Sequence, residues 1–328
     1  MKKRNYSISS VQLFCLIFAF VFSGLFLYAS GSLISVIISC AFLSIMSVVA
    51  GVLCEGFPSS EEFYAFAFGK SGSILRLISL VFLVFSSVRS LSSFSVGVTS
   101  YYKEGSAVAV FAVCAAISAF AVARDFTGAA RFVELCAFSL AGILLLSLLG
   151  KGGTAFDFSL SSYALSAAFD AVGCVAVIFS LYLRNITPSD SAMSDFARNV
   201  SFQPSPVLCG VFAPILAGAA YIFVKLMGAD GNILVVFFVW FFALARFFSL
   251  AICASDLLGL PECIGEGKKT RRASFFALIF AVVIFFGQAV PDEIIADAGI
   301  LYNVILPCSL FAGISWKEKR EERNPPRF

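Results

Sequence analysis

The segment LISVIISCAFLSIMSVVAGVL, residues Leu33–Leu53, carries no charged side chain along its whole length. An α-helix needs about 20 predominantly apolar residues to cross the hydrocarbon core of a bilayer. The segment therefore predicts a membrane-spanning helix. Only Gly31 and Ser32 separate it from an apolar run that begins at Val11, so the two form either a tight hairpin or one interrupted segment.

The composition of the whole chain extends this interpretation. The chain has 328 residues, of which 60% are hydrophobic and 13% are charged. An ordinary soluble domain is about half apolar and about a quarter charged. A soluble protein of this composition could not cover its surface with polar groups, whereas a protein dissolved in lipid does not need to. We therefore expect an all-α integral membrane protein.

Apolar runs of similar length recur along the chain and predict about ten spans in a single transmembrane domain, residues 1–328. Their expected bounds are Val11–Ser30, Leu33–Leu53, Ser73–Val98, Ala107–Val122, Arg131–Leu149, Leu165–Tyr182, Pro206–Met227, Asn232–Leu258, Ala273–Gln288 and Ile294–Ile314. Residues 315–328 form a charged tail that we expect to be disordered.

The distribution of basic residues predicts the orientation. Placing the N-terminus in the cytoplasm leaves Lys103, Lys151 and Lys225 outside and Arg89 and Arg246 within spans, and the other 18 of the 23 basic residues inside. Cytoplasmic loops carry an excess of lysine and arginine. This bias favours an even number of helices with both termini cytoplasmic. A signal peptide is the alternative interpretation of residues 1–30, but the apolar run is long and a clean cleavage site is missing.

The residue types restrict the possible chemistry. The sequence contains no histidine, which excludes histidine bases, histidine metal ligands and histidine pH switches. Its ten cysteines form no CxxC pair and lie mostly in apolar runs, as small buried thiols do. Neither a Gly-rich phosphate loop nor an acidic magnesium cluster is present. We expect no metal, no cofactor and no enzymatic activity.

Three ionisable residues lie where lipid makes them costly. Arg89 is in the middle of the third predicted span, Arg246 is near the middle of the eighth, and Asp170 is in the sixth. Such residues usually face a bundle interior and mark functional sites. We expect them to line a polar cavity, although an internal ion pair that fixes helix packing is the alternative. Arg246 could also snorkel, and Asp170 could lie at the outer interface.

Two further polar features have simpler explanations available. Glu134 follows Arg131 by three residues at a predicted helix start, a spacing typical of a local salt bridge. Residues 58–62, Pro-Ser-Ser-Glu-Glu, resemble a helix start with a serine cap and acidic residues in the first turn. The residues that follow, Phe63 to Phe68, are interpreted as an interfacial segment.

Small residues in the first and sixth spans suggest interrupted helices. Ser23 and Gly24 lie near the middle of the first span, and Gly173 follows Asp170 in the sixth. Paired interruptions of this kind indicate the substrate site in inverted-repeat transporters, where unwound backbone and helix dipoles contact the ligand. The alternative is that both glycines only allow close helix packing.

Several patches, in order along the chain, resemble one family. Residues 130–135, Ala-Arg-Phe-Val-Glu-Leu, are similar to an Ala-Arg-x-x-Glu-Ile pattern that opens a helix in that family. The other patches are Ile8–Phe14, Phe68–Lys70, Arg89, Trp240 and Ile305–Pro307. Together they resemble the endospore germination permeases, the B subunits of GerA-type nutrient receptors, in the amino acid–polyamine–organocation transporter superfamily. The family's proline after the first helix is missing around Tyr28–Ile34.

This resemblance implies a LeuT-like fold of five-plus-five inverted repeats, about residues 11–149 and about residues 165–314. It implies a midplane ligand site between helices 1, 3, 6 and 8, for which we select Ser23, Gly24, Arg89, Asp170, Gly173 and Arg246. The implied partners are a small nutrient, receptor A and C subunits and the lipid of the spore inner membrane or cell membrane, and not nucleic acid.

The sequence leaves three functions in competition. The first is a sensor subunit that binds a small nutrient, such as an amino acid, and triggers germination. The second is an amino-acid/proton symporter of the same fold that works alone, with Asp170 or Glu134 as the proton carrier. The third, which we favour least, is a membrane enzyme with a serine nucleophile and an unusual base. A purely structural subunit that has lost its ligand is a further alternative. An arginine facing the site could bind a carboxylate ligand in either of the first two.

Overall fold

The computed structural model describes residues 8–28, 32–54, 57, 60–102, 109–110, 112–114, 116, 126–138, 140–149, 158, 175–183, 205–229, 233–257 and 302–315. Within these ranges the chain forms α-helices and one short 3-10 helix, and no β-strand. The prediction of an all-α protein is confirmed for this part of the chain.

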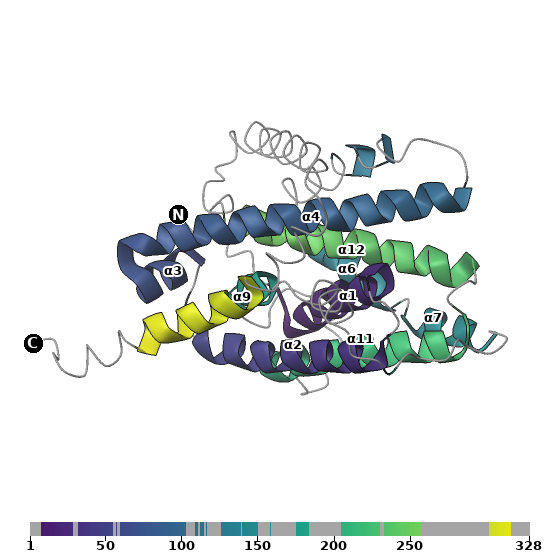
Figure 1. Ribbon diagram of the computed structural model, residues 1–328, viewed down its shortest axis with the longest axis horizontal. Coiled ribbons are helices and arrows are strands. Elements are labelled where there is room, and N and C mark those ends of the chain that lie inside the picture. The colour runs from purple at the N-terminus through teal and green to yellow at the C-terminus, as the bar shows by residue number, and fades with distance from the viewer. Residues whose placement is uncertain are drawn as a thin grey trace, which may run out of the picture.

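The helices are long and mostly apolar. They are α1 (Ser10–Tyr28), α2 (Leu33–Leu53), α3 (Ser60–Phe68), η1 (Gly69–Ser71), α4 (Gly72–Tyr102), α6 (Phe126–Phe138), α7 (Leu140–Ser147), α9 (Val175–Leu183), α11 (Pro206–Leu226) and α12 (Ile233–Leu257). A C-terminal helix, Tyr302–Ser315, is the yellow ribbon in Figure 1.

Most predicted bounds in the described part agree closely with the structure. Helix α2 has its predicted bounds, α11 differs from its prediction by one residue at its C-terminal end, and α12 differs by one residue at each end. The predicted span Arg131–Leu149 corresponds to α6 and α7, with α6 beginning at Phe126, five residues earlier than expected. The predicted span Ala273–Gln288 lies outside the described residues, as do residues 316–328 of the charged tail and most of the span Ala107–Val122.

Five stretches of helix in the described part are long and apolar enough to cross a membrane. They are Leu33–Leu53, Glu62–Val96, Ala130–Ser147, Pro206–Leu226 and Ile233–Leu250. The length and apolar composition of these helices indicate a membrane protein.

The burial pattern of α2 gives the same result from side-chain positions. Its serines Ser35, Ser39 and Ser47 are fully buried, whereas Ile45 and Val52 are 59% and 65% exposed. A soluble helix buries its apolar face and exposes its polar face. Lipid tails are as apolar as a protein interior, so a helix in a membrane can turn its apolar face outward and pack through small residues.

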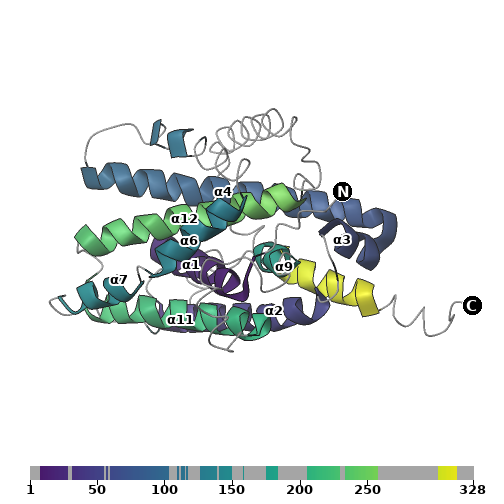
Figure 2. The same cartoon turned by 180° about the vertical axis from the view of Figure 1, so that it is seen from behind.

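Helix α1 lies at the centre of the described helices. It contacts α4, α6, α9, α11 and α12. Figure 1 shows it between the pair α4 and α12 on one side and the pair α2 and α11 on the other. Figure 2, from behind, shows α6 next to α12 and α1. A helix that is apolar all round is buried, as α1 is.

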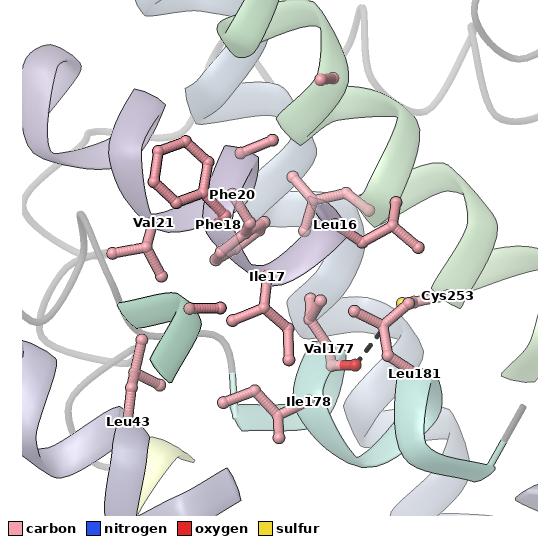
Figure 3. Close-up of a cluster of buried hydrophobic side chains, with 14 of the residues drawn as sticks. Leu16, Ile17, Phe18, Phe20, Val21, Leu43, Val177, Ile178, Leu181 and Cys253 are labelled. Atoms are coloured by element: carbon pink, nitrogen blue, oxygen red, sulfur yellow. Dashed lines mark hydrogen bonds between the residues drawn. The ribbon is translucent and has the colours of Figure 1, made fainter. Parts of the chain in front are cut away.

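The contact between α1 and α9 forms part of the core. Ile17 extends from α1 toward Val177 and Ile178 of α9, and all three side chains are buried (Figure 3). In the same cluster, Cys253 of α12 lies 3.8 Å from the carbonyl oxygen of Val177, which its thiol approaches as a weak donor. The core therefore joins helices that are distant in the sequence.

Helices α2 and α11 pack closely through small residues. A Cβ added at Gly210 of α11 would lie 3.1 Å from Ser47 Cβ of α2 and would also collide with the hydroxyl of Tyr182 in α9. A Cβ added at Gly218 would lie 2.8 Å from Cys40 Sγ of α2. The hydroxyl of Ser44 donates to Val211 O across this interface at 3.1 Å. Small residues let membrane helices approach closely, which is the alternative role that we considered for the glycines of other spans.

The prediction that the first span is interrupted at Ser23 and Gly24 is wrong. Helix α1 continues from Ser10 to Tyr28 through both residues, which are buried. The hydroxyl of Ser23 donates to Ala19 O at 2.7 Å and to Phe20 O at 3.3 Å, so both of these hydrogen bonds are to backbone carbonyls of its own helix. Tight packing on all sides stabilises the helix despite the glycine. The corresponding interruption at Gly173 lies outside the described residues.

The segment interpreted as interfacial, Phe63 to Phe68, belongs to helix α3. Phe63 and Tyr64 are buried, and the Phe63 ring stacks on Phe179 of α9 at 6.0 Å. The chain then turns at Gly69, whose φ of 58° favours glycine, and enters α4. Helix α3 is thus packed against α4 and α12, and its Phe63 also contacts α9.

Candidate functional site

The buried polar centre of the molecule is built around Arg246 of α12. This residue is 2% exposed. Its Nε donates to Ser90 Oγ of α4 at 3.0 Å, and its Nη1 donates to the carbonyl oxygen of Phe20 of α1 at 2.7 Å. A buried cation is stable only when its N–H groups are hydrogen-bonded. Arg246 thus connects α1, α4 and α12 through one guanidinium.

Phe20 contacts Arg246 with its ring as well as with its carbonyl group. The guanidinium carbon lies 3.9 Å from the centroid of the Phe20 ring. The face of an aromatic ring attracts a cation, and this attraction increases where water is excluded. The two contacts fix the plane of the guanidinium against α1. Snorkelling toward an interface, the other possibility for Arg246, is inconsistent with these contacts and this burial.

The structure brings two of the predicted site residues, Ser23 and Arg246, together at this centre. Ser23 Oγ and Arg246 Nη1 donate to the same acceptor, the Phe20 carbonyl oxygen. Gly24 follows Ser23 in α1 and is buried. The backbone carbonyl that the site uses belongs to an intact helix, and not to an unwound segment as the sequence suggested.

Arg89 is the neighbour of Ser90 in α4. Its side chain is half-buried and its Nε atom is buried. Adjacent residues leave an α-helix about 100° apart, so Arg89 extends from a different face of α4 than Ser90 does. Arg89 therefore lies beside the Arg246 centre in the sequence of α4, but it is Ser90 that makes the described contact.

Asp170 and Gly173, the other two predicted site residues, lie outside the described residues. Helix α9 begins two residues after Gly173, at Val175. The N–H of Val175 donates to Asn303 Oδ1 of the C-terminal helix at 3.0 Å, and Asn303 is 1% exposed. The first N–H groups of a helix need acceptors from outside it, and Asn303 supplies one.

A second buried polar contact joins α1 to α6. Gln12 Nε2 donates to Glu134 Oε2 at 3.2 Å, and both residues are buried. Gln12 also pairs reciprocally with Ser9: Ser9 N donates to Gln12 Oε1 at 3.2 Å and Gln12 N donates to Ser9 Oγ at 3.1 Å. This is a capping box, so the side-chain amide of Gln12 accepts from Ser9 through Oε1 and donates to Glu134 through Nε2.

The contact of Gln12 with Glu134 changes the interpretation of Glu134. Arg131 is exposed, and the described hydrogen bond to Glu134 comes from Gln12 of α1. The local pair with Arg131 stays a prediction. The Ser-x-x-Gln spacing of residues 9–12 is typical of a helix cap, but it does not indicate that Gln12 also contacts Glu134 of α6. The sequence analysis also missed Asn303, because no motif around this residue indicates that it is buried and bound to α9.

A hydroxyl cluster lies next to Asn303. Tyr302 Oη donates to Ser79 Oγ of α4 at 2.5 Å, and the hydroxyl of Tyr64 from α3 lies 3.4 Å from the same oxygen. The Tyr302 ring also stacks on Phe82 of α4, with 4.3 Å between centroids. The C-terminal helix is therefore attached to α4 by Tyr302 and to α9 by Asn303.

Within the described ranges, no group of three cysteine or carboxylate side chains lies close enough together to hold a metal ion. The class that the fold and these contacts define is a helical membrane protein with ionisable groups inside its bundle. No protein-family model matches the chain, and no curated protein matches it.

Proposed function

We propose that this chain is the membrane subunit of a spore germinant receptor that binds a small nutrient, such as an amino acid, and triggers germination. It acts by binding and conformational change, and not by catalysis. Its partners in this proposal are receptor A and C subunits. The finer architecture belongs to the same proposal: ten spans in five-plus-five inverted repeats, with both termini cytoplasmic, in the spore inner membrane or cell membrane.

The observation that carries the proposal is the burial of Arg246 between α1, α4 and α12. An ionisable side chain inside a membrane bundle is costly and marks a functional site more often than not. Guanidinium is suited to carboxylates because its parallel N–H groups match both oxygens. The resemblance of the sequence patches to germination permeases supplies the physiological setting, and the location of Arg246 supplies the chemistry.

The geometry suggests how binding would produce a response. A nutrient carboxylate that reaches Arg246 competes with Phe20 O for Nη1, and a charged acceptor forms the stronger hydrogen bond. Release of Phe20 O loosens the contact between α12 and α1, which both also contact α4, α6 and α9. The nutrient then favours one arrangement of the helices by its difference in affinity for the two.

The test is a nutrient dose–response of spores that carry Arg246→Ala or Arg89→Ala. We expect both variants to insert normally and to need much higher nutrient concentrations. The matched control is Lys70→Met, which removes a cation from an exposed position. Normal responses of both arginine variants would refute the proposed site.

The buried Glu134 favours a second candidate, an amino-acid/proton symporter that works without partner subunits. A carboxyl group inside a bundle is the type of residue that relays protons in transporters. Proteoliposomes that contain this chain alone distinguish the two functions. Accumulation of labelled amino acids that is driven by a proton gradient and lost in Glu134→Gln supports the symporter, whereas absence of uptake supports the sensor.

A further inference from the structure

Asn303 of the C-terminal helix accepts the N–H of Val175, the first residue of α9. The two residues are 128 positions apart in the sequence. Asn303 is 1% exposed, so water does not compete for its amide oxygen. A side-chain acceptor at a helix start stabilises that start and fixes where it lies.

The position of Asn303 is itself fixed by the residue before it. Tyr302 donates to Ser79 Oγ and stacks on Phe82, so this part of the C-terminal helix is attached to α4. The start of α9 is therefore held, through two consecutive residues, at a defined distance from the helix that carries Ser90 and Arg89. The Arg246 centre and the start of α9 thus share α4 as a common support.

We infer that Asn303 is a positioning residue: its amide oxygen holds the start of α9 in register with the Arg246 centre. This inference deepens the proposed function and rests on it where ligand binding is concerned. A shift of α9 relative to α4 has to break either the Val175–Asn303 hydrogen bond or the contacts of Tyr302 with Ser79 and Phe82. Asn303 therefore influences which helix arrangement is favoured, without a requirement that it touch the ligand.

The direct test is hydrogen exchange of the amides at the start of α9, measured by mass spectrometry on the purified full chain in nanodiscs. Asn303→Leu keeps the size of the side chain but removes the acceptor. We expect exchange of the peptide that contains Val175 to accelerate roughly 5- to 30-fold, which corresponds to loss of one capping interaction. Asn303→Asp keeps an acceptor, and a negative charge is favourable at a helix N-terminus, so protection should be retained.

Two controls separate this effect from general destabilisation. Ser309→Ala removes a hydroxyl from the same helix whose described bond is local, to Leu306 O at 2.9 Å, and should leave exchange of α9 unchanged. Tyr302→Phe removes only the hydroxyl that donates to Ser79 Oγ. It should accelerate exchange at the start of α9 even if Asn303→Leu fails to fold.

Equal protection in the Leu and Asp variants, or equal loss in both, would overturn the inference, because the acceptor would then not be the deciding feature. The same variants in the spore assay address ligand binding. Asn303→Leu should raise the half-maximal nutrient concentration roughly 5- to 30-fold, with Asn303→Asp near normal. If spores show no response through this chain at all, the proposed function fails while the exchange result on Asn303 still stands.

Discussion

Arg246 contacts Phe20 twice, through a 2.7 Å hydrogen bond from Nη1 to the carbonyl oxygen and through its guanidinium carbon, 3.9 Å from the ring centroid. One residue of α1 therefore provides both the dipole and the aromatic face that stabilise a buried cation of α12. Helix α1 is continuous at this point. The site is therefore formed by the Arg246 side chain reaching an intact helix, and not by an unwound segment of backbone.

Replacement of Arg246 by methionine should separate a functional arginine from a structural one. Substitution of buried charges by apolar residues of similar volume is often neutral, or stabilising by up to about 4 kcal/mol. After Arg246→Met, Phe20 O keeps the bond from Ser23 Oγ, and Ser90 Oγ can turn to a carbonyl of its own helix. We therefore expect unchanged or higher thermal stability together with loss of the nutrient response.

Thermal stability of Arg246→Met can be followed with a thiol-reactive fluorophore in detergent, because Cys15, Cys40 and Cys54 are buried and become reactive on unfolding. Cys308 is exposed and should first be replaced by serine to remove background. A fall in stability of more than about 3 kcal/mol, the cost of breaking a buried pair, would show that Arg246 has a structural role.

The contact of Gly210 with Tyr182 predicts a clear steric effect. In Gly210→Ala the new methyl group would collide with the Tyr182 hydroxyl, which donates to Pro206 O at 3.3 Å. We expect a loss of about 1–3 kcal/mol in unfolding free energy, as overpacking of a dense core usually causes. The double variant with Tyr182→Phe should recover part of this loss.

The matched control for Gly210 is Gly142→Ala in α7. An added Cβ at Gly142 meets nothing within 4 Å. Alanine is favoured over glycine inside a helix by about 0.5–1 kcal/mol, so this change should be neutral or slightly stabilising. Equal effects of the two substitutions would contradict the close approach of α2, α9 and α11.

Removal of the donor to Glu134 should cost more than neutralisation of Glu134. Gln12→Leu leaves a buried carboxylate without its described hydrogen bond and also removes the cap of Ser9, so we expect a loss of about 2–3 kcal/mol. Glu134→Gln retains an acceptor for Gln12 Nε2 and should cost less than about 1 kcal/mol. Thermal unfolding of both variants checks this order, and the reverse order would argue against the assigned contact.

Substitution of Ile45 tests the membrane assignment of α2. Ile45 is 59% exposed near the middle of that helix. An arginine at the centre of a span raises the insertion free energy by about 2.5–3.5 kcal/mol. Ile45→Arg should therefore reduce the fraction that resists alkaline extraction from membranes, whereas Ile45→Val should not. Normal integration of Ile45→Arg would mean that this face of α2 does not contact lipid.

The sequence alone determined the helical class and the position of several helices. Apolar length is a local property, so α2 had its predicted bounds and α11 and α12 were correct to within a residue at each end. The same local reasoning failed at Ser23 and Gly24. Whether a serine–glycine pair interrupts a helix depends on the side chains that pack around it, and the neighbouring residues in the sequence do not determine these.

Only the tertiary structure decided which polar groups meet. Arg246 contacts Phe20, which is 226 residues away in the sequence, and Ser90, which is 156 residues away. Gln12 contacts Glu134, which is 122 residues away. Each contact requires two helices to be rotated about their axes so that particular side chains face each other. That rotation follows from the packing of whole helices, because a buried polar group accepts only an arrangement that satisfies its hydrogen bonds.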